Sequence, residues 1–230
     1  MTAGVTLPEL QREVVRVCQA LHLRGFVANH EGNVTALTSE GRVLATPTSM
    51  GKGDVREADL VVLDRFGRKV SGARKGFSEI PMHLAVYQAR QDAGAVVHAH
   101  PANATAFACA GRAIEARFLP EFVVSVGGVV PLVPFAMPGS ETLNKALAPF
   151  LEEFDVVLLQ NHGVLAWGPD LSTALLRVEH CEEAAQVILA ADRLGGAKPI
   201  PEELVAQLLD ARGKAGLGPA GRARAGASGR

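Results

Sequence analysis

The chain has 230 residues, 48% of them hydrophobic and 20% charged, and a formal net charge of -1 at pH 7. This length suits one domain with a sizeable core. Because the chain is nearly neutral, we do not expect a nucleic-acid partner. Because no apolar run approaches the ~20 residues of a membrane-spanning helix, we do not expect a membrane partner either. The three cysteines, Cys18, Cys109 and Cys181, lie far apart in apolar segments, which favours buried, reduced thiols. With no signal-peptide pattern, we expect a cytoplasmic protein.

The first 90 residues predict a helix, several hairpin strands and a second helix. Residues 8–24 place apolar side chains at helical spacing, and Gly25 follows as a helix end. Short apolar runs separated by turn residues predict strands over residues 34–37, 42–46 and 60–64. The next helix is expected to start at Ser78 as N-cap, with Pro81 in its first turn.

The second half predicts strands interleaved with helices. Residues 94–100 form a short strand, and Pro101 starts a helix. The apolar run 127–136 contains two prolines, which suits an edge strand. The remaining elements are a helix over 139–151, two strands within 155–168 around a turn at 161–163, a long helix over 171–196 and a last helix over 201–213. Residues 214–230 are mainly Gly, Ala and Arg, so we expect a domain over 1–213 followed by a disordered tail.

Two histidines stand one residue apart at the end of the strand 94–100. Alternate residues of a strand point to the same face, so His98 and His100 can direct both imidazoles to one point. A zinc site needs further ligands, and His162 lies where another apolar strand meets a glycine turn. By itself the pair is explained as well by the polar end of a strand, while His83 and His180 fit ordinary helix packing.

Five motifs occur together, in order and at family-like spacing. They cover residues 32–37, 45–54, 77–88, 95–101 and 158–168. Jointly they resemble the class II aldolase/adducin family over about residues 8–195. The resemblance implies an α/β fold, a three-layer α/β/α sandwich with a mostly antiparallel central sheet. It also implies a homotetramer with active sites at subunit contacts.

The resemblance assigns the metal ligands. It implies that His98, His100 and His162 bind Zn²⁺, with Mn²⁺ or Co²⁺ as alternatives, and that Glu79 is both fourth ligand and acid/base. The chemistry agrees, because a ketose 1-phosphate offers a neighbouring carbonyl and hydroxyl whose negative charge a metal stabilises during carbon–carbon cleavage. Taken alone, Glu79 is better explained as a residue that stabilises the N-terminus of its helix.

A phosphate site is also implied. Small polar residues and backbone N–H groups suit a phosphate, and the matching residues here are Gly32, Asn33, Thr48, Ser49 and Ser78. Taken singly, each is typical of a turn. The chain departs from the family pattern at two nearby positions. Phe77 replaces a serine, and Ser49 stands where glycine is frequent.

In the family that this chain resembles, a tyrosine from a neighbouring subunit protonates the departing aldehyde oxygen. This chain has no counterpart of that tyrosine. The single tyrosine, Tyr87, falls in the helix after Glu79 and matches a structural family tyrosine. Glu121, shortly before a Gly-Gly pair, occupies the equivalent place and is the candidate for this proton transfer. The alternative is an ordinary exposed carboxylate.

We therefore expect a zinc-dependent aldolase that cleaves a ketose 1-phosphate, of fuculose, ribulose, or 5-deoxy- or methylthio-pentulose type, through a metal-stabilised enediolate. The products are dihydroxyacetone phosphate and an aldehyde. A second hypothesis keeps the metal but decarboxylates or dehydrates a sugar phosphate, which the missing tyrosine slightly favours. A third is a non-catalytic scaffold, which has no need to retain four ligands.

Overall fold

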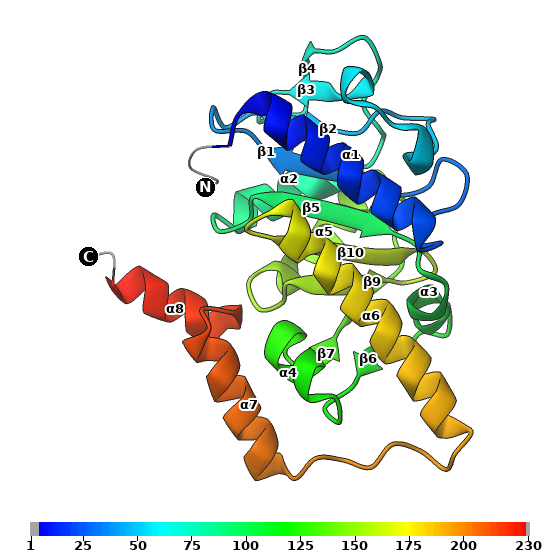
Figure 1. The fold of residues 1–230 in the computed structure, drawn as a ribbon, viewed down its shortest axis with the longest axis vertical. Helices are drawn as coiled ribbons and strands as arrows, with labels where there is room; N and C mark the ends of the chain where they lie inside the picture. Colours follow the sequence, from blue (N-terminus) through cyan, green and yellow to red (C-terminus); the bar gives the residue numbers. More distant parts are fainter. Residues whose placement is uncertain (1–4, 229–230) are drawn as a thin grey trace.

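An eight-stranded sheet forms the centre of the structure, a computed structural model that describes residues 5–228 (Figure 1). The strands are β1 (Asn33–Leu37), β2 (Val43–Ala45), β3 (Val61–Leu63), β4 (Lys69–Ser71), β5 (Ala95–Ala99), β8 (Leu132–Val133), β9 (Val156–Leu159) and β10 (Gly163–Gly168). Their order is β4-β3-β2-β1-β5-β10-β9-β8. All neighbours are antiparallel except β8 and β9, so the expected mostly antiparallel sheet is confirmed.

Helices cover both faces of this sheet. One face carries α1 (Leu7–Leu23), α3 (Ala102–Cys109) and α6 (Leu171–Asp192), and the other carries α2 (Ile80–Ala89) and α5 (Glu141–Leu151). In Figure 1, α1 and α6 cross in front of the sheet and α2 lies behind it. The side chains of β5 alternate accordingly, since Val96 packs with α2 and α5 while Val97 packs with α1 and α6. The three-layer α/β/α sandwich is therefore confirmed.

Several elements differ from the expected ones in position or kind. Helix α2 begins at Ile80 with Glu79 as its N-cap, one residue later than predicted. A short helix, α4 (Pro120–Val126), and a small second sheet of β6 (Ile114–Glu115) and β7 (Val129–Val130) were not predicted. The predicted edge strand is confirmed as β8 at the end of the main sheet.

The C-terminal segment corrects the prediction of a disordered tail. After α7 (Glu202–Lys214), helix α8 covers Gly218–Ser228, and α7 packs against both α4 and α8. Arg222 of α8 reaches the buried Asp155, with Nη1 3.0 Å from Oδ1. The prediction rested on apolar burial alone, whereas this segment packs against α7 and also forms an ion pair with Asp155. Residues 1–4 and 229–230 of the predicted domain and tail lie outside the described residues.

The cysteines follow the prediction only in part. Cys18 and Cys181 are buried, but Cys109 is exposed at the end of α3, and all three are free thiols. Among the described residues, no helix is both long and apolar enough to cross a lipid bilayer.

Candidate metal centre

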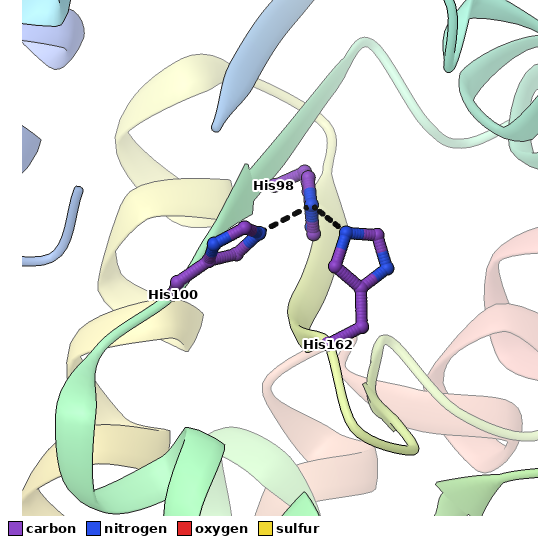
Figure 2. A group of neighbouring side chains, drawn as sticks. All are labelled: His98, His100 and His162. Atoms are coloured by element: carbon purple, nitrogen blue, oxygen red, sulfur yellow. Dashed lines mark hydrogen bonds between the residues drawn. The ribbon is translucent and has the colours of Figure 1, made fainter. Parts of the chain in front are cut away.

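Three imidazoles meet where two neighbouring strands come together (Figure 2). His98 and His100 lie at the end of β5, and His162 directly precedes β10, whose Leu165 pairs with His98. The Nε2 atom of His98 lies 3.0 Å from Nε2 of His100 and 3.2 Å from Nε2 of His162. Nitrogens that share one tetrahedral zinc are roughly 3.3 Å apart. The structure thus brings together His98 and His100, which the spacing singled out, and His162, the candidate from the next strand end.

A hydrogen bond on the far side of the His98 ring determines which of its two nitrogens carries the proton. Nδ1 of His98 lies 2.8 Å from the carbonyl oxygen of Val164, which can only accept, so this Nδ1 carries the proton. Nδ1 of His100 lies 3.3 Å from Oε2 of Glu31, within ion-pair distance of that carboxylate. Nε2 of His98 therefore presents a lone pair to the Nε2 atoms of the other two rings, and a shared cation can bind this lone pair. This donor set suits zinc.

Glu79 completes the group from the start of α2. Its Oε1 lies 3.3 Å from Nε2 of His162, and its Oε2 lies 3.6 Å from Nε2 of His98. Nδ2 of Asn33 donates a hydrogen bond of 2.9 Å to Oε2. Oε1 is buried and accepts no hydrogen bond. A buried carboxylate oxygen without a donor, next to the imidazole of His162, fits a fourth ligand or a proton carrier.

Burial keeps the imidazoles in the form that binds metals. The pKa of His98 lies well below its ordinary value, chiefly because the ring is fully buried and also because the rings of His100 and His162 are close. Burial also lowers the pKa of His162, against the opposing field of the Glu79 carboxylate. Neutral rings at neutral pH leave the lone pairs available to a cation.

A second row of polar groups lies behind Glu79. On α2, Glu79, His83 and Tyr87 recur every four residues, opposite Asn33 and Thr35 on β1. Oγ1 of Thr35 lies 2.8 Å from both Nδ1 of His83 and the hydroxyl of Tyr87. His83 is therefore part of a buried hydrogen-bonded network next to the centre rather than a simple packing residue. The four-residue spacing was the signal that could have revealed it.

The burial of His83 predicts a pH-dependent stability. Burial lowers its pKa to about 3, whereas the unfolded residue titrates near 6.5. The unfolded chain then binds the extra proton, so each pH unit below about 6.5 removes ~1.4 kcal/mol of unfolding free energy until about pH 3. We expect metal-free wild type to lose ~1.4 kcal/mol more than His83→Gln between pH 7.5 and 5.5, measured by urea unfolding. Equal losses in the two proteins would contradict this origin.

Three residues predicted for the phosphate are exposed on adjoining segments. Thr48 and Ser49 follow β2, and Ser78 precedes α2. The N–H of Thr48 donates to the carbonyl of Lys75 at 3.0 Å, which joins the two segments. Ser49 has a φ of 56°, in the left-handed region that favours glycine. Oγ1 of Thr48 lies 3.5 Å from Oγ of Ser49, and the phosphate role of the three residues stays a prediction.

The other two residues predicted for the phosphate are buried beside the histidines. A Cβ on Gly32, whose φ is 70°, would lie 2.6 Å from Cγ1 of Val27 and 2.8 Å from the carbonyl oxygen of His98. Glycine is thus required for the chain before β1 to pack against β5. Asn33 is 5% exposed and uses its amide to hold Glu79. Their observed contacts are with the centre, and their phosphate role stays a prediction.

Glu121 is the predicted site residue that the structure leaves apart. It is exposed on the first turn of α4, and within the described part of the chain no hydrogen bond or ion pair joins it to the histidines. Phe77, which replaces the family serine, is buried, and its ring packs edge-on against His83 with centroids 5.1 Å apart. Phe77 therefore belongs to the core rather than to a phosphate site.

Comparisons with known proteins identify relatives of this chain. The chain is 32% identical to 3-oxo-tetronate 4-phosphate decarboxylase of Escherichia coli K12 over 78% of this chain and 85% of that protein. It is 31% identical to L-fuculose phosphate aldolase of the same strain over 88% of this chain and 93% of that protein. A solved L-fuculose 1-phosphate aldolase superposes with a TM-score of 0.81 at 29% identity, covering 88% and 95% of the two chains.

The family model for the class II aldolase and adducin N-terminal domain matches residues 12–189, which include the whole histidine group and Glu79. Because that match spans most of the chain and the sandwich fold agrees, the chain belongs to the class II aldolase and adducin N-terminal domain family.

Proposed function

We propose that the chain is a metal-dependent lyase that breaks a carbon–carbon bond of a sugar phosphate in the cytoplasm. The preferred reaction is aldol cleavage of a ketose 1-phosphate to dihydroxyacetone phosphate and an aldehyde. The observation that carries the proposal is the group of imidazole nitrogens at His98, His100 and His162, with Oε1 of Glu79, which accepts no hydrogen bond, 3.3 Å from Nε2 of His162. We propose Zn²⁺ as the ion, with Mn²⁺ or Co²⁺ as alternatives.

A bound divalent ion supplies Lewis acidity, which stabilises negative charge on the adjacent carbonyl and hydroxyl oxygens of the substrate. His98, His100 and His162 would hold this ion. Asn33 fixes Oε2 of Glu79 and leaves Oε1 available to move a proton to or from the enediolate carbon. The burial of this carboxylate excludes bulk water from the proton transfer, which raises the effect of each nearby charge.

The rest of the substrate requires groups outside this core. We propose that the hydroxyls of Thr48, Ser49 and Ser78 bind the phosphate, together with the backbone near Gly32 and Asn33. We propose a homotetramer in which Glu121 of a neighbouring subunit protonates the departing aldehyde oxygen. Glu121 is exposed, and among the described residues no hydrogen bond or ion pair joins it to the histidines of its own chain.

Decarboxylation of a 3-oxo sugar-acid phosphate is the second candidate. The decarboxylase of Escherichia coli K12 is as similar to this chain as the aldolase is. The chain's one tyrosine, Tyr87, is held by Thr35 in the buried network. Loss of carbon dioxide leaves no alkoxide to protonate, so this reaction does not need the missing acid.

Product identity separates the candidates. Zinc-loaded protein would be incubated with a panel of ketose 1-phosphates and 3-oxo sugar-acid phosphates, and the products identified by mass. Dihydroxyacetone phosphate with an aldehyde is the expected result. Carbon dioxide with a ketone phosphate would assign the decarboxylase, and loss of water a dehydratase. No turnover across the panel by metal-loaded protein would favour a scaffold.

A further inference from the structure

The segment before β1 folds back against the end of β5. The backbone N–H of His100 donates to the carbonyl of Phe26 at 2.8 Å. At the other end of the segment, Gly32 approaches the carbonyl of His98 so closely that a Cβ would lie 2.8 Å from it. Residues 26–32, which we call the β1 approach loop, are therefore fixed at both ends to the strand that carries two of the three histidines.

The carboxylate of Glu31 lies in this loop and contacts the outer nitrogen of His100. Its Oε2 is 3.3 Å from Nδ1 of His100 and 3.3 Å from the backbone N–H of Ala28. The N–H of Glu31 donates in turn to the carbonyl of Ala28 at 3.0 Å. The local turn therefore restrains the carboxylate in front of the ring.

A buried lysine holds the same loop from the other side. Lys52 is 1% exposed, and its Nζ donates to the carbonyls of His30 at 3.1 Å and Met50 at 3.0 Å. Burial lowers the pKa of Lys52, while Cys18 and the charge of Glu31 oppose that change. The ammonium thus fixes the residue next to Glu31 and attracts its carboxylate.

We propose that Glu31 is a positioning residue of the metal centre, which accepts the Nδ1–H of His100 and so directs its Nε2 lone pair at the shared point. This inference rests on the proposed metal centre. A carboxylate behind a ligating imidazole fixes the tautomer, limits rotation of the ring and increases its basicity. His98 obtains the same support from the backbone carbonyl of Val164, which substitution cannot remove. Glu31 is therefore the outer contact that mutagenesis can test.

Zinc affinity of the full-length, metal-free chain is the measurement. We expect Glu31→Ala to bind Zn²⁺ 10–100-fold more weakly than wild type, in competition with a chromogenic chelator. Glu31→Gln keeps an acceptor for the imidazole N–H but loses the charge, so its loss is expected to be smaller. Glu57→Ala, which removes the same charge from the exposed η2 turn (Glu57–Asp59), is the matched control and is expected to bind like wild type.

Thermal unfolding of the metal-free proteins separates positioning from folding. We expect Glu31→Ala to melt like wild type without metal, and to gain less stability when Zn²⁺ is added. Unchanged zinc affinity in Glu31→Ala would overturn the proposal and leave the metal centre intact. A metal-free Glu31→Ala protein that is largely unfolded would also overturn it, since the role would then be structural. A wild-type chain that binds no zinc would overturn the metal centre and this inference together.

Discussion

Replacing Glu79 by glutamine is expected to leave zinc bound and to lower kcat by about 10²–10⁴-fold. The three histidine nitrogens remain in place, so the ion keeps most of its ligands. The amide can still accept from Asn33, but it cannot carry a proton to or from the substrate. Zinc content of the purified protein and steady-state rates on the substrate found in the panel are the two measurements.

Two further variants make that result specific. His98→Ala removes the central imidazole, which contacts both other rings, and is expected to lose zinc and activity together. His180→Ala, on α6 beside Glu183, is the matched control and should keep both. A Glu79→Gln enzyme with wild-type kcat would remove Glu79 from proton transfer. Loss of zinc as complete as in His98→Ala would make it mainly a ligand.

The α/β/α sandwich could be predicted where the apolar residues recur at a clear strand or helix period. Strand and helix periods identified the apolar faces of β5 and α6, and these faces form the core on both sides of the sheet. Helix α4 was missed because its Val-rich sequence favours strands. Its packing against α7 overrides that local preference. Helix α8 was missed for a different reason, because its attachment includes the ion pair of Arg222 with Asp155, which no hydrophobic period encodes.

The candidate site, too, could be predicted from the sequence only in part. His98 and His100 share a strand face, so their convergence follows from local geometry. His162 was a candidate because an apolar strand meets a glycine turn there, and the family pattern supplied Glu79. The contact between Glu31 and His100 depends on how the β1 approach loop folds back on β5, and no sequence period encodes that. Asn33 was predicted as a phosphate ligand, but the packing of α2 against β1 places its amide on Glu79.

The largest expected loss of stability comes from Asp155, a 1% exposed carboxylate at the start of β9. Four guanidinium groups surround it, those of Arg90, Arg177, Arg212 and Arg222, at 2.7, 3.3, 2.8 and 3.0 Å. Burial raises the pKa of Asp155, but the nearby arginines outweigh this and hold it below its ordinary value. The charged carboxylate is therefore the common partner of α2, α6, α7 and α8.

Asp155→Asn is expected to lower the free energy of unfolding by about 3–5 kcal/mol, because it leaves buried guanidinium groups without their shared anion. Asp92→Asn is the matched control. Asp92 also pairs with Arg90, at 2.7 Å, but its side chain is 46% exposed, so its loss should be under about 1 kcal/mol. Urea unfolding measures both, and hydrogen exchange should show early opening of α7 and α8 in Asp155→Asn. Equal losses in the two variants would mean that helix packing, and not the buried anion, holds the C-terminal helices to the sheet.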